Sequence, residues 1–228
     1  MPRTFGKCVT LLVSVSLGLA MSACSGGSST AAADPESTAV PTTGPTTGTP
    51  TATPSNTFPP QQPAPRPAAG SIEVKGSTYT YDAPKGWTDG TDQFKTINPN
   101  IENGYLDKPR NNYSDNINVI RADTEPKMAP AEAEKQFAKE LDTLANNVRT
   151  LPRTTLGGVL ALHQTAAKTY QAKGRPGSYK LTFDQYTTYV DDTWFAITFT
   201  YLADTPKARK NAEINGVLTS WRWVAPSS

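Results

Sequence analysis

The composition of the chain changes abruptly near Ser71, and this boundary limits what can fold. All four tryptophans and all nine tyrosines lie after it, whereas half of the 20 prolines lie between residues 25 and 70. That proline-rich stretch contains three charged side chains and one aromatic one. It has too little apolar surface to offset the entropy lost on ordering. We therefore expect residues 24–70 to be a disordered tether and residues 71–228 to be one folded domain.

The N-terminal residues predict export across a membrane. Arg3 and Lys7 precede an apolar run from Val9 to Met21, and this run is shorter than the roughly 20 residues that span a bilayer. A basic start, a short apolar core and small residues at the end are typical of a secretory signal peptide. A buried first helix is the alternative, but the tether rather than a folded sequence follows it. We expect residues 1–23 to be the signal peptide.

The end of this segment, "MSAC" at residues 21–24, resembles the lipobox of bacterial lipoproteins, although Met21 stands where that family usually has leucine. The resemblance implies that Cys24 carries diacylglycerol on its sulfur and becomes the mature N-terminus. The protein would then be held at the extracytoplasmic face of the cell membrane, where two or more acyl chains give stable anchoring. An ordinary cleavage site with a chance cysteine is the alternative.

Cysteine and charge counts exclude several kinds of site. The chain has two cysteines, Cys8 and Cys24. Cys8 would leave with the signal peptide, so the mature chain could form no internal disulfide and no metal site that needs several thiolates. Of 22 basic and 20 acidic residues, three and two precede residue 71, which leaves a nearly neutral domain. We therefore expect no nucleic-acid partner.

Alternating apolar residues and β-branched runs predict strands in the domain. The predicted strands cover residues 77–84, 116–123, 159–172, 178–190 and 194–202. The last two flank residues 191–193, an Asp-Asp-Thr sequence that predicts a β-hairpin turn. Phe195, Ile197 and Phe199 share strand parity, so we expect them to face the helices together. Thr198 lies on the opposite parity and is expected to contribute much less to stability.

Two helices are predicted between and after these strands. Pro130 and Pro206 stand where a proline can open a helix. Apolar residues at helical spacing follow each proline, namely Phe137, Leu141, Leu144 and Val148 in the first helix and Ile214, Val217, Leu218 and Trp221 in the second. The order of elements indicates an α+β fold, in which an antiparallel β-sheet packs against two helices.

The sequence "YTYDAPKGW", residues 79–87, resembles the opening strand and P-x-G-W turn of PsbP-like domains. "NINVIRAD", the helix opened by proline, "TLGGVLALHQTA" and "LTSWRW" then follow in the order of that family. The resemblance covers about residues 71–224. The PsbP-like family includes small actinobacterial lipoproteins that have the same layout of a lipobox, a Thr/Pro tether and a single domain. The resemblance implies a binding or assembly role with no common chemistry, because a fold alone transfers no active site.

His163 is the one histidine of the chain, and histidine is the most frequent general base. It lies in a predicted strand between Leu162 and Gln164, and no G-x-S-x-G motif accompanies it. The sequence does not exclude a Ser-His-acid site, because its three residues can be far apart in the chain. Asp184 and Glu140 would form a glycosidase pair only if the fold brought them together. We expect His163 to be structural or exposed, and we assign no catalytic residue.

The remaining motifs are weak indications of a ligand. Asp89 and Asp92 could contact calcium, but they do not form the D-x-D-x-D-G loop. A turn at Gly90 is the preferred interpretation. The "NYS" sequence at residues 112–114 is a formal glycosylation acceptor. The resemblance to a bacterial lipobox makes glycosylation at this asparagine a weak interpretation. We expect no metal and no cofactor.

The aromatic residues are the remaining candidates for a binding surface. The domain has more of them than a core of this size requires, notably Trp87, Tyr105, Tyr113, Tyr186, Trp194 and Trp223. Sheet packing is the simpler explanation. The functional hypothesis is a groove between sheet and helix, because aromatic rings supply binding area with few rotamers to freeze. It places Trp87 at the rim of the groove and adds Tyr105, Tyr113 and Trp194 as ligand-binding residues.

Two classes of function follow from these observations. The first is a non-catalytic module, anchored in the membrane through Cys24, that binds or assembles an envelope protein or an apolar envelope ligand. The second is an envelope hydrolase with an unrecognised site. The lone histidine and the missing motifs favour the first class.

Overall fold

The computed structural model describes residues 71–123, 144–171, 178–191 and 193–224, together with single positions between 135 and 142. The predicted signal peptide, Cys24 and the predicted tether lie outside these residues. All the described residues belong to one compact unit.

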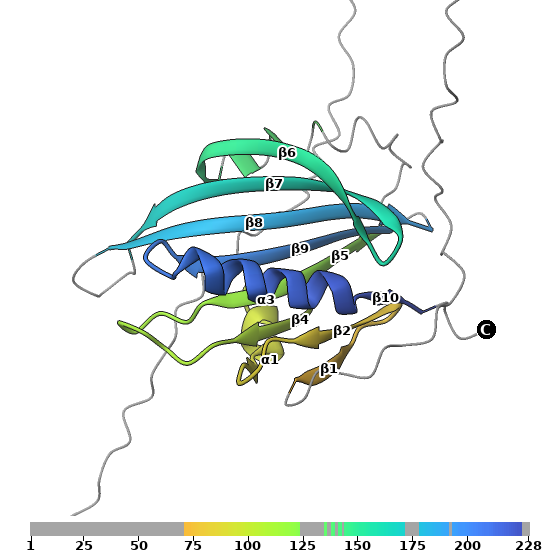
Figure 1. Ribbon diagram of the computed structural model, residues 1–228, viewed down its shortest axis with the longest axis horizontal. Coiled ribbons are helices and arrows are strands. Elements are labelled where there is room, and N and C mark those ends of the chain that lie inside the picture. The colour runs from red at the N-terminus through yellow and green to blue at the C-terminus, as the bar shows by residue number, and fades with distance from the viewer. Residues whose placement is uncertain are drawn as a thin grey trace, which may run out of the picture. The chain divides into compact units, whose positions relative to one another are not determined.

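A seven-stranded antiparallel sheet forms the centre of the domain (Figure 1). Across the sheet the strands are β3 (Thr88–Asp89), β4 (Ile101–Leu106), β5 (Asn116–Asp123), β9 (Thr193–Leu202), β8 (Tyr179–Val190), β7 (Val159–Tyr170) and β6 (Asn146–Leu156). Strand β5 has the predicted bounds, and β7, β8 and β9 lie within two residues of theirs. The antiparallel sheet of the predicted α+β fold is confirmed.

A second, three-stranded sheet ties the two ends of the domain together. Strand β2 (Tyr79–Ala83) lies in its centre, between β1 (Ile72–Lys75) and β10 (Arg222–Trp223). Every second residue of β2 is buried, as the predicted alternation requires. Neither β1 nor β10 was expected, because both are short.

The predicted hairpin joins β8 and β9. Val190 pairs with Thr193, so two residues form the loop, and Asp191 has a φ of 48°. Two-residue hairpin loops need positive φ, which aspartate tolerates better than most residues do. The prediction of Asp191 as a turn residue is confirmed.

The C-terminal helix α3 (Lys207–Ser220) is also confirmed, and it crosses one face of the large sheet (Figure 1). Its Ile214 and Val217 are buried in a cluster with Ile117, Val119 and other residues of that face. Trp221 caps the helix at its end and is fully buried.

The other predicted helix ends earlier than expected. The described positions from Lys135 to Leu144 are helical, whereas Pro130 and Phe137 lie outside the described residues. Val148 belongs to β6, so its assignment to the helical stripe is wrong. The last helical position is Leu144, and Asn146 already begins β6.

Helix α1 (Thr91–Lys95) was not predicted, because its sequence was interpreted as a turn. The amide of Thr91 donates to Asp89 Oδ1 at 2.8 Å, and this bond places Asp89 just before the helix. The fully buried Phe94 of α1 packs with Ile101, Ile120 and Ala196. Since Ile120 and Ala196 lie on the sheet face opposite α3, the sheet is covered on both sides.

The parity of β9 is confirmed, but its second face is also buried. Phe195, Ile197 and Phe199 are at most 1% exposed and share the cluster beneath α3. Thr198, on the other face, is only 2% exposed, and its hydroxyl donates to Gln185 Oε1 at 3.4 Å. Because Thr198 is buried, we expect it to contribute more to the stability of the domain than the alternating sequence pattern predicts.

Strand β6 forms the outer edge of the sheet beyond β7. It is 11 residues long, and only Leu156 is buried. Its pairing with β7 shifts between Asn146 and Arg149 and again between Leu151 and Thr154. The strand escaped prediction because an exposed edge carries no alternation of apolar and polar residues.

Candidate binding groove

A groove of about 240 Å³ lies between the end of β2 and helix α3. It is lined by Ser71, Asp82, Ala83, Pro84 and Lys85 on one side and by Ala212, Glu213, Gly216 and Val217 on the other. Small and apolar side chains form most of this lining, and charged groups come from three residues. The groove therefore suits an apolar group with a polar edge.

A tight turn shapes the β2 side of the groove. The amide of Trp87 donates to the carbonyl of Pro84 at 3.1 Å, and Gly86 has a φ of 83°. This is the geometry of a type II turn, which requires positive φ at its third residue. The P-x-G-W sequence thus leaves Lys85 exposed at the groove and directs Trp87 into the protein.

Gly216 shapes the α3 side of the groove. It lies one helical turn after Ala212, so the two small residues form one stripe of the groove wall. A Cβ added at Gly216 would meet no atom within 4 Å. A glycine inside a helix costs up to about 1 kcal/mol relative to alanine. No packing contact requires this glycine, and its lack of a side chain keeps the groove open.

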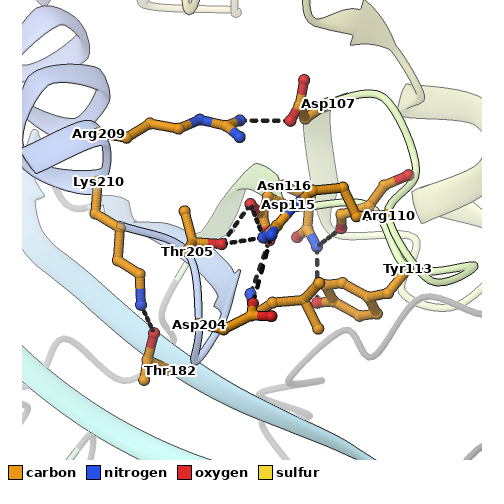
Figure 2. Close-up of polar contacts among 12 residues, drawn as sticks. Asp107, Arg110, Tyr113, Asp115, Asn116, Thr182, Asp204, Thr205, Arg209 and Lys210 are labelled. Atoms are coloured by element: carbon orange, nitrogen blue, oxygen red, sulfur yellow. Dashed lines mark hydrogen bonds and ion pairs between the residues drawn. The ribbon is translucent and has the colours of Figure 1, made fainter. Parts of the chain in front are cut away.

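Contacts at both ends of α3 hold the helix against its neighbours. At the C-terminal end, the amide of Asp82 donates to Ser220 Oγ at 2.9 Å. At the N-terminal end, Arg209 bonds to Asp107 (Figure 2). Within α3 it also donates to Glu213 Oε1 at 2.9 Å. The bond from Asp82 to Ser220 joins the β2 wall of the groove to α3, whereas the bond from Arg209 to Asp107 ties α3 to the loop after β4.

Burial changes the acid–base properties of two residues on α3. It raises the pKa of the Glu213 carboxyl above its ordinary value, a shift that the bond from Arg209 opposes. It lowers the pKa of Lys210, whose ammonium group donates to Thr182 Oγ1 at 2.8 Å and lies 5.7 Å from the ring centre of Tyr201. Both side chains therefore bond to other side chains of the domain, and neither is placed as a catalytic acid or base.

Asp115 is the centre of the polar contacts before α3 (Figure 2). Its Oδ1 accepts the amide of Leu202 at 2.7 Å, and its Oδ2 accepts Thr205 Oγ1 at 2.9 Å and Arg110 Nη2 at 3.3 Å. The carboxylate thereby joins the loop of residues 107–115 to the turn that leads into α3. Apart from the "NYS" sequence, this loop matched no motif, and Asp115 was not predicted.

The four aromatic residues proposed for ligand binding do not meet in one groove. Trp87, Tyr105, Tyr113 and Trp194 are at most 7% exposed. Trp87 and Tyr105 belong to the cluster beneath α3, whereas Tyr113 and Trp194 belong to a cluster on the other side of the sheet. The prediction of Trp87 as a rim residue is wrong, because the turn that precedes it directs its ring toward Tyr201, at 6.4 Å between ring centres.

His163 forms a pair that sequence alone could not show. Its Nε2 lies 2.9 Å from Asp184 Oδ1, and its ring stacks on Tyr186 at 4.3 Å. Within the described residues, no serine or threonine hydroxyl bonds to this ring. Glu140, the other carboxylate considered with Asp184, lies outside those residues.

The structure describes the residues of the remaining predicted calcium and glycosylation sites. Asp92 is exposed in the first turn of α1, and Asn112, which opens the "NYS" sequence, is exposed with a φ of 64°. Across the described ranges no cluster of three histidine, cysteine or acidic residues could hold a metal ion. No helix among the same residues is long and apolar enough to cross a membrane.

Comparison with known proteins supplies similar folds but no family. Neither a protein-family model nor a curated protein matches the chain. It is similar to the Ran-binding protein Mog1p of Saccharomyces cerevisiae, with 14% identity and a TM-score of 0.47 over 68% of this chain and 95% of that one. LpqN of Mycobacterium tuberculosis, involved in cell envelope biogenesis, gives 15% identity and a TM-score of 0.43 over 68% and 90%.

The chain is also similar to two further solved structures. A cyanobacterial PsbP from Synechocystis gives 12% identity and a TM-score of 0.44 over 68% of this chain and 94% of that one. A protein of Bacteroides thetaiotaomicron, at 14% identity and a TM-score of 0.42, is matched over only 48% of its own length. The similar folds thus include a PsbP and an envelope-biogenesis protein, and at these scores the likeness carries no information about function.

Proposed function

We propose that this chain is an actinobacterial lipoprotein with a PsbP-like domain, anchored through Cys24 on the extracytoplasmic face of the cell membrane. Its domain acts as a non-catalytic binding module that holds an extended segment of an envelope protein in the groove between β2 and α3. The observation that carries the proposal is Gly216, which weakens α3, is required by no neighbour and lines the groove.

The size of the groove favours a peptide segment over a whole small molecule. Pockets for drug-sized ligands span about 300–1,000 Å³, and this groove has about 240 Å³. That volume suits a few small side chains of a longer segment, whose backbone remains partly outside. The charged groups of Asp82, Lys85 and Glu213 can then meet polar groups of the same segment.

Preorganisation also supports a binding role. The bond from the Asp82 amide to Ser220 Oγ joins the β2 wall of the groove to the α3 wall. A rigid site loses little conformational entropy when a segment binds, so a small contact area can still give useful affinity.

A hydrolase remains the second class, and the His163–Asp184 pair is the observation that would support it. A histidine base needs a nucleophile or a water-binding site within hydrogen-bond reach. The ring of His163 instead stacks on Tyr186, in line with a structural role.

The anchoring part of the proposal rests on Cys24. Replacing Cys24 with alanine should abolish lipidation and cleavage before this residue, because the sulfur is the acyl acceptor that the lipobox resemblance implies. Mass spectrometry of the mature N-terminus measures the outcome. An unmodified Cys24 in the parent protein, or cleavage at another residue, would refute lipid anchoring while leaving the groove untouched.

The groove part is tested by filling it. With a photo-crosslinking residue in place of Lys85, which is exposed at the edge of the groove, the membrane-bound protein should form a crosslinked adduct with a partner protein. Gly216→Leu should lower the yield of this adduct at least tenfold, because the leucine side chain would occupy the groove.

Asn215→Leu is the matched control, since it adds a leucine at the neighbouring exposed position of α3 that does not line the groove. The control should leave the adduct unchanged. Equal yields from both variants would contradict binding in the groove, as would the absence of any adduct that depends on residue 216.

A further inference from the structure

We propose that the proline-rich end of the tether, residues 59–70, folds back into the same groove and competes there with the partner segment. This inference rests on the proposed function of the groove, and it adds a means of regulating that site from within the chain.

The first argument is where the tether joins the domain. Ser71, the first described residue, lines the groove. Ile72 follows in β1 and pairs with Ala83, another lining residue at the end of β2. Strand β1 then runs away from the groove. The chain before Ser71 therefore approaches the domain at the groove itself and not at a distant surface.

The second argument is the chemistry of the segment. Residues 59–70 read "PPQQPAPRPAAG". Proline pre-sets an extended polyproline II conformation, so such a segment loses little entropy when it docks. Its proline and alanine side chains are small and apolar, as are Ala83, Pro84, Ala212 and Val217 in the groove.

The third argument is charge. Arg66 is the only basic residue between positions 25 and 70. The groove lining contains two carboxylates, from Asp82 and Glu213, and one ammonium group, from Lys85. Arg66 stands five residues before Ser71, a span of about 15 Å in polyproline II geometry. The Arg209 guanidinium already pairs with Glu213 at 2.9 Å, so Asp82 is the lining carboxylate that the Arg66 guanidinium can approach.

Covalent linkage makes even a weak contact significant. A short linker gives an effective concentration in the millimolar range. A segment with an intrinsic Kd of about 1 mM would then occupy the groove roughly half of the time. A partner must displace it, so loss of this contact should strengthen partner binding about twofold or more.

Amide ¹⁵N relaxation of residues 24–228 carrying Cys24→Ser tests the proposal. Docking for part of the time should raise the order parameter of the Arg66 amide clearly above the values of tether residues farther from the groove, which should be those of flexible backbone, below about 0.6. Gly216→Leu and Arg66→Glu should each lower that order parameter, because one fills the groove and the other reverses the charge.

Asn215→Leu and Glu36→Lys are the matched controls for bulk and for charge, and they should leave the Arg66 order parameter unchanged. A flexible Arg66 in the parent protein, or equal order parameters in all variants, would overturn the proposal. If Arg66 is flexible and Gly216→Leu still reduces crosslinking, tether docking fails while the groove function stands. If Arg66 is ordered but no crosslinked partner forms, the tether docks and the partner function fails.

Discussion

Phe199→Ala should lower the free energy of unfolding by about 3–5 kcal/mol, the range for a buried phenylalanine. Phe199 is fully buried, meets Tyr186 edge-on at 6.1 Å between ring centres and lies parallel to Tyr201 at 6.5 Å. Truncation would leave a cavity between the sheet and α3 that rigid strands cannot close. Urea denaturation of the parent and variant domains measures the difference.

Thr198→Ala is the control for this prediction, and it should cost about 1 kcal/mol. Thr198 is buried on the other face and loses only a methyl group and a long bond to Gln185. Comparable losses from Phe199→Ala and Thr198→Ala would mean that the two faces of β9 are packed equally tightly.

Asp115→Ala should destabilise the domain by about 3–5 kcal/mol, as expected when one partner of a buried charged network is removed. The amide of Leu202, the hydroxyl of Thr205 and the guanidinium of Arg110 would all lose their acceptor. The turn before α3 would then lose its attachment to the loop of residues 107–115. Thermal and urea denaturation measure the change.

Asp204→Ala is the matched control, because Asp204 also pairs with Arg110, at 3.4 Å. Its side chain is 68% exposed, and exposed ion pairs contribute at most about 1 kcal/mol. A similar cost for the two substitutions would show that Arg110, and not the acceptor at Asp115, holds this region together.

The central strands could be predicted because their pattern reflects one well-packed face. Residues 116–123 and the hairpin of β8 and β9 carry β-branched and aromatic residues at a period of two, and this period survives in the structure. The same pattern gives the wrong exposure for Thr198. A threonine between large apolar residues indicates a solvent-facing position, yet helical residues and α1 cover that face as well.

The edges of the fold could not be predicted in this way. Strand β6 is held by main-chain bonds to β7 and leaves most of its side chains exposed, so its sequence has no reason to alternate. Helix α1 is only five residues long and depends on the bond from Asp89 and the burial of Phe94. The packing of Phe94 on Ile120 and Ala196 depends on residues distant in the sequence, whereas β6 pairs with the strand that follows it directly but has no buried face to give it a pattern.

The candidate site was missed for a related reason. The sequence predicts a groove between sheet and helix but assigns it to aromatic residues, which the fold buries in its cores. The groove is lined instead by small residues that carry no chemical signal in a sequence. Gly216 was visible as an unfavourable residue in a predicted helix, and an unexplained glycine of this kind could have indicated the site.

The irregular pairing of β6 has a consequence for how copies of this domain behave when they are crowded. An unprotected edge strand offers a row of hydrogen-bonding groups to which another chain can add. Strand β6 carries two pairing shifts, Pro152 within the second of them, and the cations of Arg149 and Arg153. A colliding copy would meet a missing amide, a bent backbone and like charges, so the sheet resists growth into an aggregate along this edge.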